Sequence, residues 1–513
     1  MGTSPLALLG LAFVVACSSG DDNGKSGSGG SSATGGSGGS GGASGSGGAG
    51  GAAGSGGGIQ SGTEITLGDG VVKGQVVGST RVFRGIPYAE PPVGPLRWKP
   101  PQKKQPWSTP KDATQPGPKC PQFELMSSVI SGNEDCLTVD VWAPEPAPTQ
   151  PLPVMVWIHG GGFTSGAGTA SEFEGAKLVP AGNIVQVNIN YRLGPLGFLA
   201  HSGLTSEDAA HPTSGNFGFE DQQLGLAWVK ANVNAFGGDP ANVTIFGESA
   251  GGMSVCLHLV APASQALYQR AIIESGPCEG FETTLAQAEK QGDDFAKALG
   301  CSDLACLRGK TSDDVLKALP LKKAFFFGTG ASWGPNVDGK VLPKAPATLV
   351  AEGSLAKVPV VLGTNADEGD LFTLLGGLNG IDEATYTTMI TAMGAQLGLD
   401  SAQVLAKYPA SGYASPAAAL AAVMTDGAFV CPTRRLARAL VSHGAPAYLY
   451  HFTRAITLLG ATKAFHAAEI PFVFGNSLAG FTPAGQELEL SKTMMGYWTR
   501  FAASANPNGA GAV

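Results

Sequence analysis

Short apolar runs alternate with longer segments of helical period along most of the chain. The runs Pro153–Ile158, Asn183–Asn190 and Val358–Leu362 are rich in β-branched residues and predict buried strands. Residues Glu220–Phe236 place apolar side chains at helical spacing, so they predict a helix that packs on one face. This alternation favours an α/β fold, with a mostly parallel central sheet covered by helices on both faces.

A further β-branched run leads into a Gly-x-Ser-x-Gly motif at Ser249. Residues Val243–Gly252 read VTIFGESAGG, so the motif lies between a strand and an apolar helical segment. A strained strand-to-helix turn of this kind presents a nucleophilic serine, and Gly247 and Gly251 leave room for close packing. The same short pattern occurs without this pair of flanking elements at Ser37, Ser40 and Ser332.

Three glycines follow the strand that ends at Ile158, in the segment HGGGF. Glycines in this place allow backbone N–H groups to turn toward a small cavity, as in an oxyanion hole. We therefore expect Gly161, Gly162 and Ala250 to supply the N–H groups. The alternative interpretation is a flexible turn in a glycine-rich chain.

Four further blocks occur in the same order as in a known family. They are Gly85–Trp98, Glu134–Trp142, Asn190–Gly194 and Gly215–Gln222. Together with the two glycine motifs, they resemble the type B carboxylesterases, the cholinesterase-like branch of the α/β-hydrolases, over roughly residues 64–513. The resemblance implies an α/β-hydrolase fold with helical insertions, and a serine carboxylesterase activity on carboxylic esters.

The histidine of the expected catalytic set must follow the acid, because α/β-hydrolases order their triad as serine, acid and histidine. Of the seven histidines, only His443, His451 and His466 leave room for an acid after the serine. His451 lies in an apolar strand-like run, and His443 lies at an expected helix end. His466 lies in AFHAAEIPFVFG, which resembles the family's histidine loop, and we expect it to be the general base.

Two neighbouring carboxylates, Asp367 and Glu368, follow the strand Val358–Leu362. The family's acid aligns with Glu368, which we expect to orient the histidine. Asp367 remains the alternative, although it could simply begin a helix. The resemblance also implies a polar network behind the histidine, formed by Glu248 and Ser275.

The resemblance implies two ion pairs that anchor loops near the site, Arg97–Glu134 and Arg192–Asp221. It also implies two disulfides, Cys120–Cys136 and Cys301–Cys306. Cys256 lies in an apolar helical segment and is expected in the core, whereas the bonding of Cys256, Cys278 and Cys431 stays open. In the family, the partner of Cys431 lies in a C-terminal segment, and this chain ends before such a segment.

The N-terminal region predicts export. The apolar run Leu6–Ala16 is too short to span a bilayer and is typical of a signal peptide. It ends in VVAC, which resembles a bacterial lipoprotein cleavage box with Cys17 as the lipidated residue. No Lys or Arg precedes the run, so an ordinary signal peptide and free secretion remain the alternative.

We therefore divide the chain into a signal peptide (1–17), a flexible Gly/Ser/Ala tether (18–58) and a catalytic domain (59–513). An outer-membrane lipoprotein is the first expectation for location, and an extracellular enzyme the second. The membrane would then be a partner only through the lipid.

Composition narrows the remaining function classes. The net charge is −8 with no basic run, so the sequence predicts no nucleic-acid partner. No Cys/His spacing suggests zinc, and we expect neither metal nor cofactor. The loop between Cys120 and Cys136 lacks the tryptophan of the family's choline-binding members, which disfavours acetylcholine. Candidate side chains for an apolar substrate pocket, or for ordinary core, are Phe123, Leu125, Met126, Phe163 and Phe325–Phe327.

Three alternatives follow for function. The first is a serine carboxylesterase, the second a non-catalytic adhesion or binding protein on the same fold, and the third a hydrolase whose natural bond is an amide or carbamate. A complete set of Ser249, Glu368 and His466 favours an enzyme, since a binding protein would not need it. The sequence does not distinguish the acyl group, the alcohol or the oligomeric state.

Overall fold

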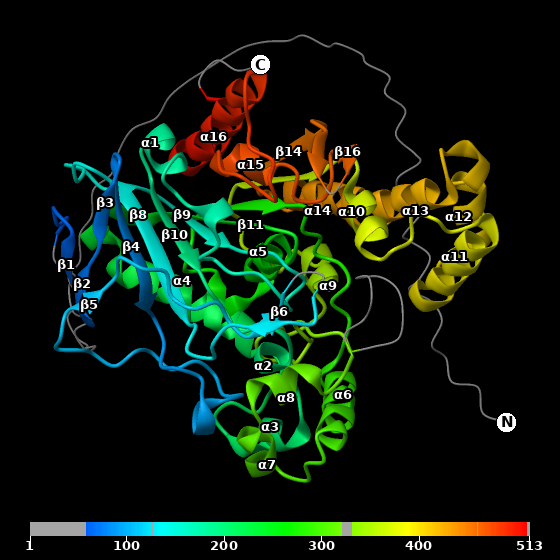
Figure 1. Ribbon diagram of the computed structural model, residues 1–513, viewed down its shortest axis with the longest axis horizontal. Coiled ribbons are helices and arrows are strands. Elements are labelled where there is room, and N and C mark those ends of the chain that lie inside the picture. The colour runs from blue at the N-terminus through cyan, green and yellow to red at the C-terminus, as the bar shows by residue number, and fades with distance from the viewer. Residues whose placement is uncertain (1–57, 125–126, 321–330, 459, 510–513) are drawn as a thin grey trace, which may run out of the picture.

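The computed structural model describes residues 58–124, 127–320, 331–458 and 460–509 (Figure 1). The signal peptide, Cys17 and nearly all of the tether lie outside these residues, and so do five of the pocket candidates, Leu125, Met126 and Phe325–Phe327.

A nine-stranded sheet forms the centre of the molecule. Its order is β14 (Ala447–Phe452), β13 (Val360–Asn365), β12 (Arg270–Glu274), β11 (Gly238–Glu248), β9 (Leu152–Ile158), β10 (Val185–Ile189), β8 (Thr138–Pro144), β4 (Thr80–Pro87) and β3 (Gln75–Val77). The neighbours from β14 to β10 pair in parallel, and those from β10 to β3 pair antiparallel. The sheet is therefore mixed and mostly parallel, as the sequence pattern predicts.

Three small sheets lie outside the central one. They are β1 (Glu64–Leu67), β2 (Gly70–Lys73) and β5 (Lys111–Asp112); β6 (Gln122–Phe123) and β7 (Ile130–Ser131); and β15 (Ile456–Leu458) and β16 (Ala461–Lys463).

Helices cover both faces of the central sheet, because its strands are apolar on both sides. In β9, Val154 and Val156 belong to the large core that includes α4 (Phe217–Phe236) and α5 (Ala250–Val260). Met155 and Trp157 alternate with them and belong to a second core on the other face. The helices of that face are α1 (Leu178–Gly182), α15 (Ile470–Phe474) and α16 (Gln486–Ser504).

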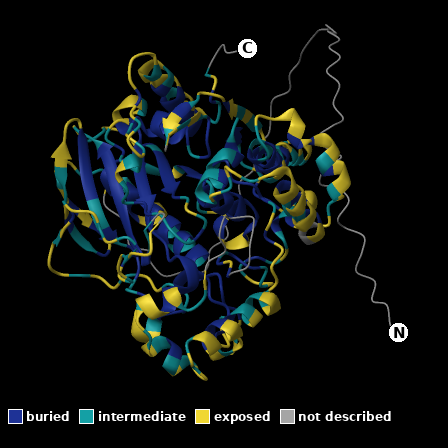
Figure 2. Cartoon of the chain, turned by 45° about the vertical axis from the view of Figure 1, so that its right-hand side comes forward, coloured by how far each residue is buried: buried dark blue, intermediate teal, exposed yellow. Residues whose placement is uncertain are grey.

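The described residues form further α-helices outside these two groups. They are α2 (Gly194–Phe198), α3 (Ser202–Glu207), α6 (Leu285–Ala298), α7 (Leu304–Gly309), α8 (Ser312–Lys317), α9 (Pro346–Ala351), α10 (Glu368–Leu375), α11 (Glu383–Leu397), α12 (Ser401–Lys407), α13 (Pro416–Met424) and α14 (Cys431–Ser442). Figure 2 shows the sheet buried, with exposed residues concentrated on the outlying helices.

A π-helical segment, Thr425–Val430, joins α13 to α14. The continuous run Pro416–Ser442 is long and apolar enough by composition to cross a membrane. However, 61% of its apolar window is buried inside the protein, which is what the core helix of a globular domain shows as well. Single π-helical turns are frequent at functional sites.

Both expected ion pairs are present. Arg192 donates from Nε and Nη2 to the carboxylate of Asp221, at 2.8 Å each, and both side chains are buried. Arg97 donates from Nε to Glu134 at 2.8 Å and through Nη1 to the carbonyl of Lys310 at 2.6 Å. The bonds of Arg97 tie its segment to the loop before β8, through Glu134, and to the end of α7, through Lys310.

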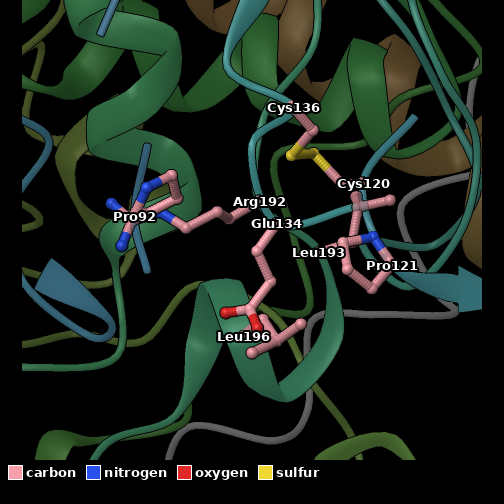
Figure 3. A pocket seen from close by; sticks show the side chains of 8 residues that line it. All are labelled: Pro92, Cys120, Pro121, Glu134, Cys136, Arg192, Leu193 and Leu196. Atoms are coloured by element: carbon pink, nitrogen blue, oxygen red, sulfur yellow. A yellow bond between two sulfur atoms is a disulfide. The ribbon is translucent and has the colours of Figure 1, made fainter. Parts of the chain in front are cut away.

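Figure 3 shows Arg192 and Glu134 beside the disulfide Cys120–Cys136, around a cavity of about 10 Å³. A cavity of that size has room for one water at most. The second expected disulfide, Cys301–Cys306, is also present. Cys256 is fully buried, as expected, but it also forms a disulfide with Cys278, which ties α5 to the loop after β12.

The ion pair of Arg97 predicts a stability effect. Glu134→Gln leaves a largely buried guanidinium without its counter-charge, so we expect the free energy of unfolding to fall by about 3 kcal/mol. The matched control is Glu64→Gln, which breaks the exposed pair with Lys73 and should cost less than about 1 kcal/mol. Urea unfolding measures both, and equal effects would contradict the assigned role of burial.

Candidate active site

A strained turn between β11 and α5 presents Ser249. Its φ of 56° and ψ of −124° lie in a region that residues other than glycine rarely adopt. The surroundings hold this geometry, since Ser249 N–H donates to the carbonyl of Glu274 at 2.9 Å. A Cβ on Gly251 would lie 1.9 Å from the carbonyl oxygen of Ile158, and one on Gly247 would lie 2.6 Å from it. Only glycine fits at these two positions.

His466 and Glu368 meet behind the turn. Glu368 opens α10 just after β13, and His466 lies on the loop between β16 and α15. His466 Nδ1 is 2.7 Å from Glu368 Oε2, and both side chains are buried. The carboxylate of Asp367 instead accepts from the N–H of Ala464 at 2.9 Å and faces Lys463. Of the two candidate acids, Glu368 is therefore the one that contacts the histidine.

Three donors surround the Glu368 carboxylate. Ser275 Oγ donates to Oε1 at 2.5 Å, and the N–H of Asn365 donates to the same oxygen at 2.7 Å. His466 Nδ1–H supplies the third. Ser275 itself has a positive φ of 49°, so the end of β12 is bent to bring its hydroxyl to this carboxylate. A carboxylate held by this many donors stabilises a protonated imidazole beside it.

The other ring nitrogen of His466 faces a second carboxylate. Nε2 is 3.1 Å from Glu248 Oε1, and Glu248 is buried. Within the described residues, no hydrogen bond joins His466 to the hydroxyl of Ser249. The histidine thus lies between two carboxylates, one on each ring nitrogen.

Charge and burial oppose each other at this histidine. Burial lowers the pKa of His466, but the carboxylates of Glu248, Glu368 and Glu469 outweigh it and raise the pKa to about 9. The pKa of Glu248 is raised to about 7, because its burial outweighs the opposing effect of His466, and the charge of Glu368 adds to the rise. The proton affinities of Glu248 and His466 therefore depend on each other.

Two phenylalanines cover the imidazole. Phe372 from α10 and Phe429 from the π-helical segment each have their ring centre 5.0 Å from that of His466. The two phenyl rings also stack on each other, with centres 5.7 Å apart. The sequence analysis did not identify either residue as part of the site. The position of Phe372, one helical turn after Glu368, could have indicated it, whereas no sequence pattern indicated the π-helical turn that places Phe429.

The glycine loop lies against Ser249. A Cβ on Gly160 would lie 3.1 Å from the Cβ of Ser249, and Gly161 and Gly162 have positive φ values of 104° and 61°. In the part of the chain that the structure describes, the N–H groups of Gly161 and Gly162 donate to no protein acceptor. Ala250 is the first residue of α5, where N–H groups have no partner within the helix.

His159 braces this loop as a neutral side chain. It stacks on Tyr191, with ring centres 4.4 Å apart, and its Nδ1 is 2.8 Å from the carbonyl of Gly160. Burial lowers the pKa of His159 to about 4, so Nδ1–H can donate to that carbonyl at neutral pH. Phe163, a pocket candidate, is buried against Phe198 and Phe281, and Phe123 is half-buried.

Two further buried carboxylates belong to the site and were missed by sequence reasoning. Glu469 receives a hydrogen bond from the side-chain amide of Asn365. Glu274 accepts from Trp498 Nε1 at 2.9 Å. A glutamate at the end of an apolar strand, as in AIIES, was the one signal for Glu274. No group of three or more His, Cys, Asp or Glu side chains among the described residues is arranged to hold a metal ion.

Comparisons with known proteins identify the family. A carboxylesterase family model matches residues 61–513. The chain belongs to the carboxylesterase family. It is 39% identical to the para-nitrobenzyl esterase of Bacillus subtilis over 457 residues, which are 86% of this chain and 89% of that protein. It is 34% identical to the acetylcholinesterase of Bungarus fasciatus over 471 residues, covering 84% and 76% of the two chains.

A solved structure of a PNB esterase shares the fold, with a TM-score of 0.76 at 38% identity, covering 87% of this chain and 92% of the other. The α/β-hydrolase fold expected from the sequence is therefore confirmed, and this carboxylesterase is a carboxylic ester hydrolase.

The charges around His466 predict the pH dependence of this carboxylesterase. A histidine with a raised pKa loses its proton only at higher pH, so kcat/KM should fall as pH drops through a midpoint above 6.5. Glu248→Gln removes a charge that raises the pKa, and should move this midpoint to lower pH. The control is Glu489→Gln, an exposed surface carboxylate paired with Lys492. A wild-type midpoint at or below 6.5 would contradict the electrostatic account.

Proposed function

We propose that the protein hydrolyses carboxylic esters through a covalent acyl-Ser249 intermediate, with His466 as general base and Glu368 as the residue that orients it. The observation that carries the proposal is the 2.7 Å contact between His466 Nδ1 and the buried carboxylate of Glu368, directly behind the turn that presents Ser249. A binding protein on this fold would gain nothing from holding a histidine in this way.

The reaction would proceed in two balanced steps. His466 Nε2 takes the proton of Ser249 while the serine oxygen attacks the ester carbonyl carbon. The proton then passes to the leaving alcohol as the carbon–oxygen bond to it breaks, which leaves the acyl-enzyme. A water attacks in the same way, releases the carboxylic acid and restores Ser249.

The negative oxygen of each tetrahedral intermediate needs donors. The N–H groups of Gly161, Gly162 and Ala250 are the proposed oxyanion hole, because Gly160 beside them packs against Ser249 and none of the three has an acceptor within the described protein. Glu248 and Ser275 support the arrangement, Ser275 through Glu368 and Glu248 from beside Nε2.

His466 Nε2 would turn from Glu248 to Ser249 during turnover. The two acceptors lie on adjacent residues, and Glu248 ends β11 immediately before the serine. A small rotation of the imidazole about its bond to Cβ would exchange one for the other, while Nδ1 keeps its contact with Glu368. Glu248 would also hold the imidazolium between the two proton transfers, because a nearby negative charge favours it.

The proposed substrates are small-molecule esters with an apolar part, since Phe372 and Phe429 cover the histidine. The relative named para-nitrobenzyl esterase makes para-nitrobenzyl and para-nitrophenyl esters suitable first probes. The loop Cys120–Cys136 lacks a tryptophan, which argues against acetylcholine despite the similarity to an acetylcholinesterase.

The nucleophile is tested by substitution and by labelling. Ser249→Ala should lower kcat by several orders of magnitude, because only the oxyanion hole and binding contacts remain. An organophosphate should label the wild-type enzyme at Ser249, as located by peptide mass spectrometry. The matched control is Ser332→Ala, an exposed serine in the same short pattern, which should keep full activity. Full activity of Ser249→Ala, or an adduct on another residue, would refute the assignment.

We also propose that the enzyme is an exported lipoprotein, with a signal peptide over residues 1–17 and diacylation of Cys17. Two acyl chains anchor a protein stably, whereas one binds only marginally. Residues 18–58 would act as a tether reaching about 35 Å as a flexible coil. The outer membrane is the proposed location, with free secretion as the alternative.

Membrane fractionation tests the anchor. The full chain, expressed in a bacterial host, should sediment with membranes, and Cys17→Ala should move to the soluble fraction. Ser18→Ala, which keeps the cysteine, serves as the control and should stay with the membranes. If the wild type and Cys17→Ala are both soluble, the lipid anchor is refuted and the tract is a spacer.

A further inference from the structure

Three buried carboxylates, Glu248, Glu368 and Glu469, act on His466 in this enzyme, and a fourth, Glu274, is buried beside Glu469 and Glu248. Glu248 is 6% exposed, and Glu274, Glu368 and Glu469 are fully buried. If all four were ionised beside a protonated His466, three negative charges would remain uncompensated in the interior. Such burial costs several kcal/mol per ion, so carboxyl groups in this position take up protons instead.

Both oxygens of Glu368 have hydrogen-bond donors. They receive hydrogen bonds from Ser275, from the N–H of Asn365 and from His466.

Glu274 and Glu469 are held differently. Glu274 Oε1 accepts from Trp498, and Glu469 Oε2 accepts from Asn365. Their remaining oxygens, Glu274 Oε2 and Glu469 Oε1, are buried, and no donor among the described residues reaches either of them. Ionised carboxylates can only accept, so a proton on one of the two would supply the missing donor.

The surroundings of Glu274 favour the proton there. Burial, and after it the charge of Glu469, raise the pKa of Glu274 well above its ordinary value. The N–H of Trp498 opposes this rise without cancelling it. Burial also raises the pKa of Glu469, together with the charges of Glu248 and Glu368, but Glu469 keeps the amide of Asn365 as a donor.

In the described parts of the chain, the titratable groups that act on the pair belong to the same cluster. They are Glu248 at the end of β11, Glu368 on α10, His466 on the loop before α15, and Tyr450 on β14. The hydroxyl of Tyr450 is buried without a partner in the described chain. Tyr450 and Trp498 also line a hollow of about 450 Å³ beside β14, so they separate the carboxylates from this opening.

We propose that Glu274 is a positioning residue that keeps one proton buried in a Glu274–Glu469 acid pair, donating it to Glu469 Oε1 while accepting from Trp498. The pair then carries one negative charge, on Glu469, rather than two. That charge helps to set the proton affinity of His466, so the inference rests on the proposed role of His466 as general base.

Three variants test the charge assignment through the acid limb of kcat/KM. Glu274→Gln can accept from Trp498 and donate to Glu469, so the midpoint of the limb should match that of the wild type. Glu469→Gln removes the charge, so the midpoint should move down by about one pH unit. Glu274→Leu removes the donor, so Glu469 should take up its own proton and the midpoint should fall in the same way.

A merely structural role would not give this pattern, in which the neutral amide restores the profile and leucine does not. A midpoint that falls in Glu274→Gln as far as in Glu469→Gln would mean that Glu274 is ionised, and would overturn the proposal.

Infrared spectroscopy tests the proton directly and does not depend on activity, so it separates this inference from the proposed function. In the Ser249→Ala protein at pH 8, a carbonyl stretching band of a protonated carboxylic acid should be present. Glu274→Gln in that background should lose the intensity of one carboxyl group, whereas Glu469→Gln should retain it at a shifted frequency. Equal band intensity with and without Glu274 would overturn the proposal.

Discussion

Close backbone packing around Ser249 fixes the geometry of this site, since there is no room for a Cβ atom at the glycines beside it. At Gly251, the helix α5 packs so closely on β9 that a Cβ would lie 1.9 Å from the carbonyl oxygen of Ile158. Gly252 and Gly276 show the same crowding between α5 and the end of β12. Because these segments pack on bare backbone, the ends of three neighbouring strands converge on Ser249. The strained φ and ψ of the serine are a consequence of that packing.

Charge is the second constraint, and it acts on His466. The imidazole contacts a carboxylate through each nitrogen, and burial alone would make it a weak base. The pKa of His466 depends on the charges of the surrounding glutamates. Glu274, another buried glutamate, accepts a hydrogen bond from Trp498 on the C-terminal helix α16.

Local motifs and the family resemblance were sufficient to predict the fold, and they named Glu368 and His466, which are in contact in the structure. The strand before Ser249 and the glycines after β9 are short-range patterns, each with a direct structural cause. The choice of Glu368 and His466 instead used the order in which α/β-hydrolases place their serine, acid and histidine. The choice of Glu368 over Asp367 needed the resemblance, since both follow the same strand. The contact between Glu274 and Trp498 and the disulfide Cys256–Cys278 could not be predicted, because side chains distant in sequence meet only after folding.

The most direct measurement is a crystal structure of the enzyme inhibited by a phosphonate ester, whose tetrahedral phosphorus mimics the intermediate. The account predicts a bond from Ser249 Oγ to phosphorus, with the phosphoryl oxygen about 2.7–3.1 Å from the N–H groups of Gly161, Gly162 and Ala250. His466 Nε2 should have turned from Glu248 toward the serine oxygen, with Nδ1 still on Glu368. A phosphoryl oxygen that points away from these N–H groups, or a histidine that stays on Glu248, would contradict it.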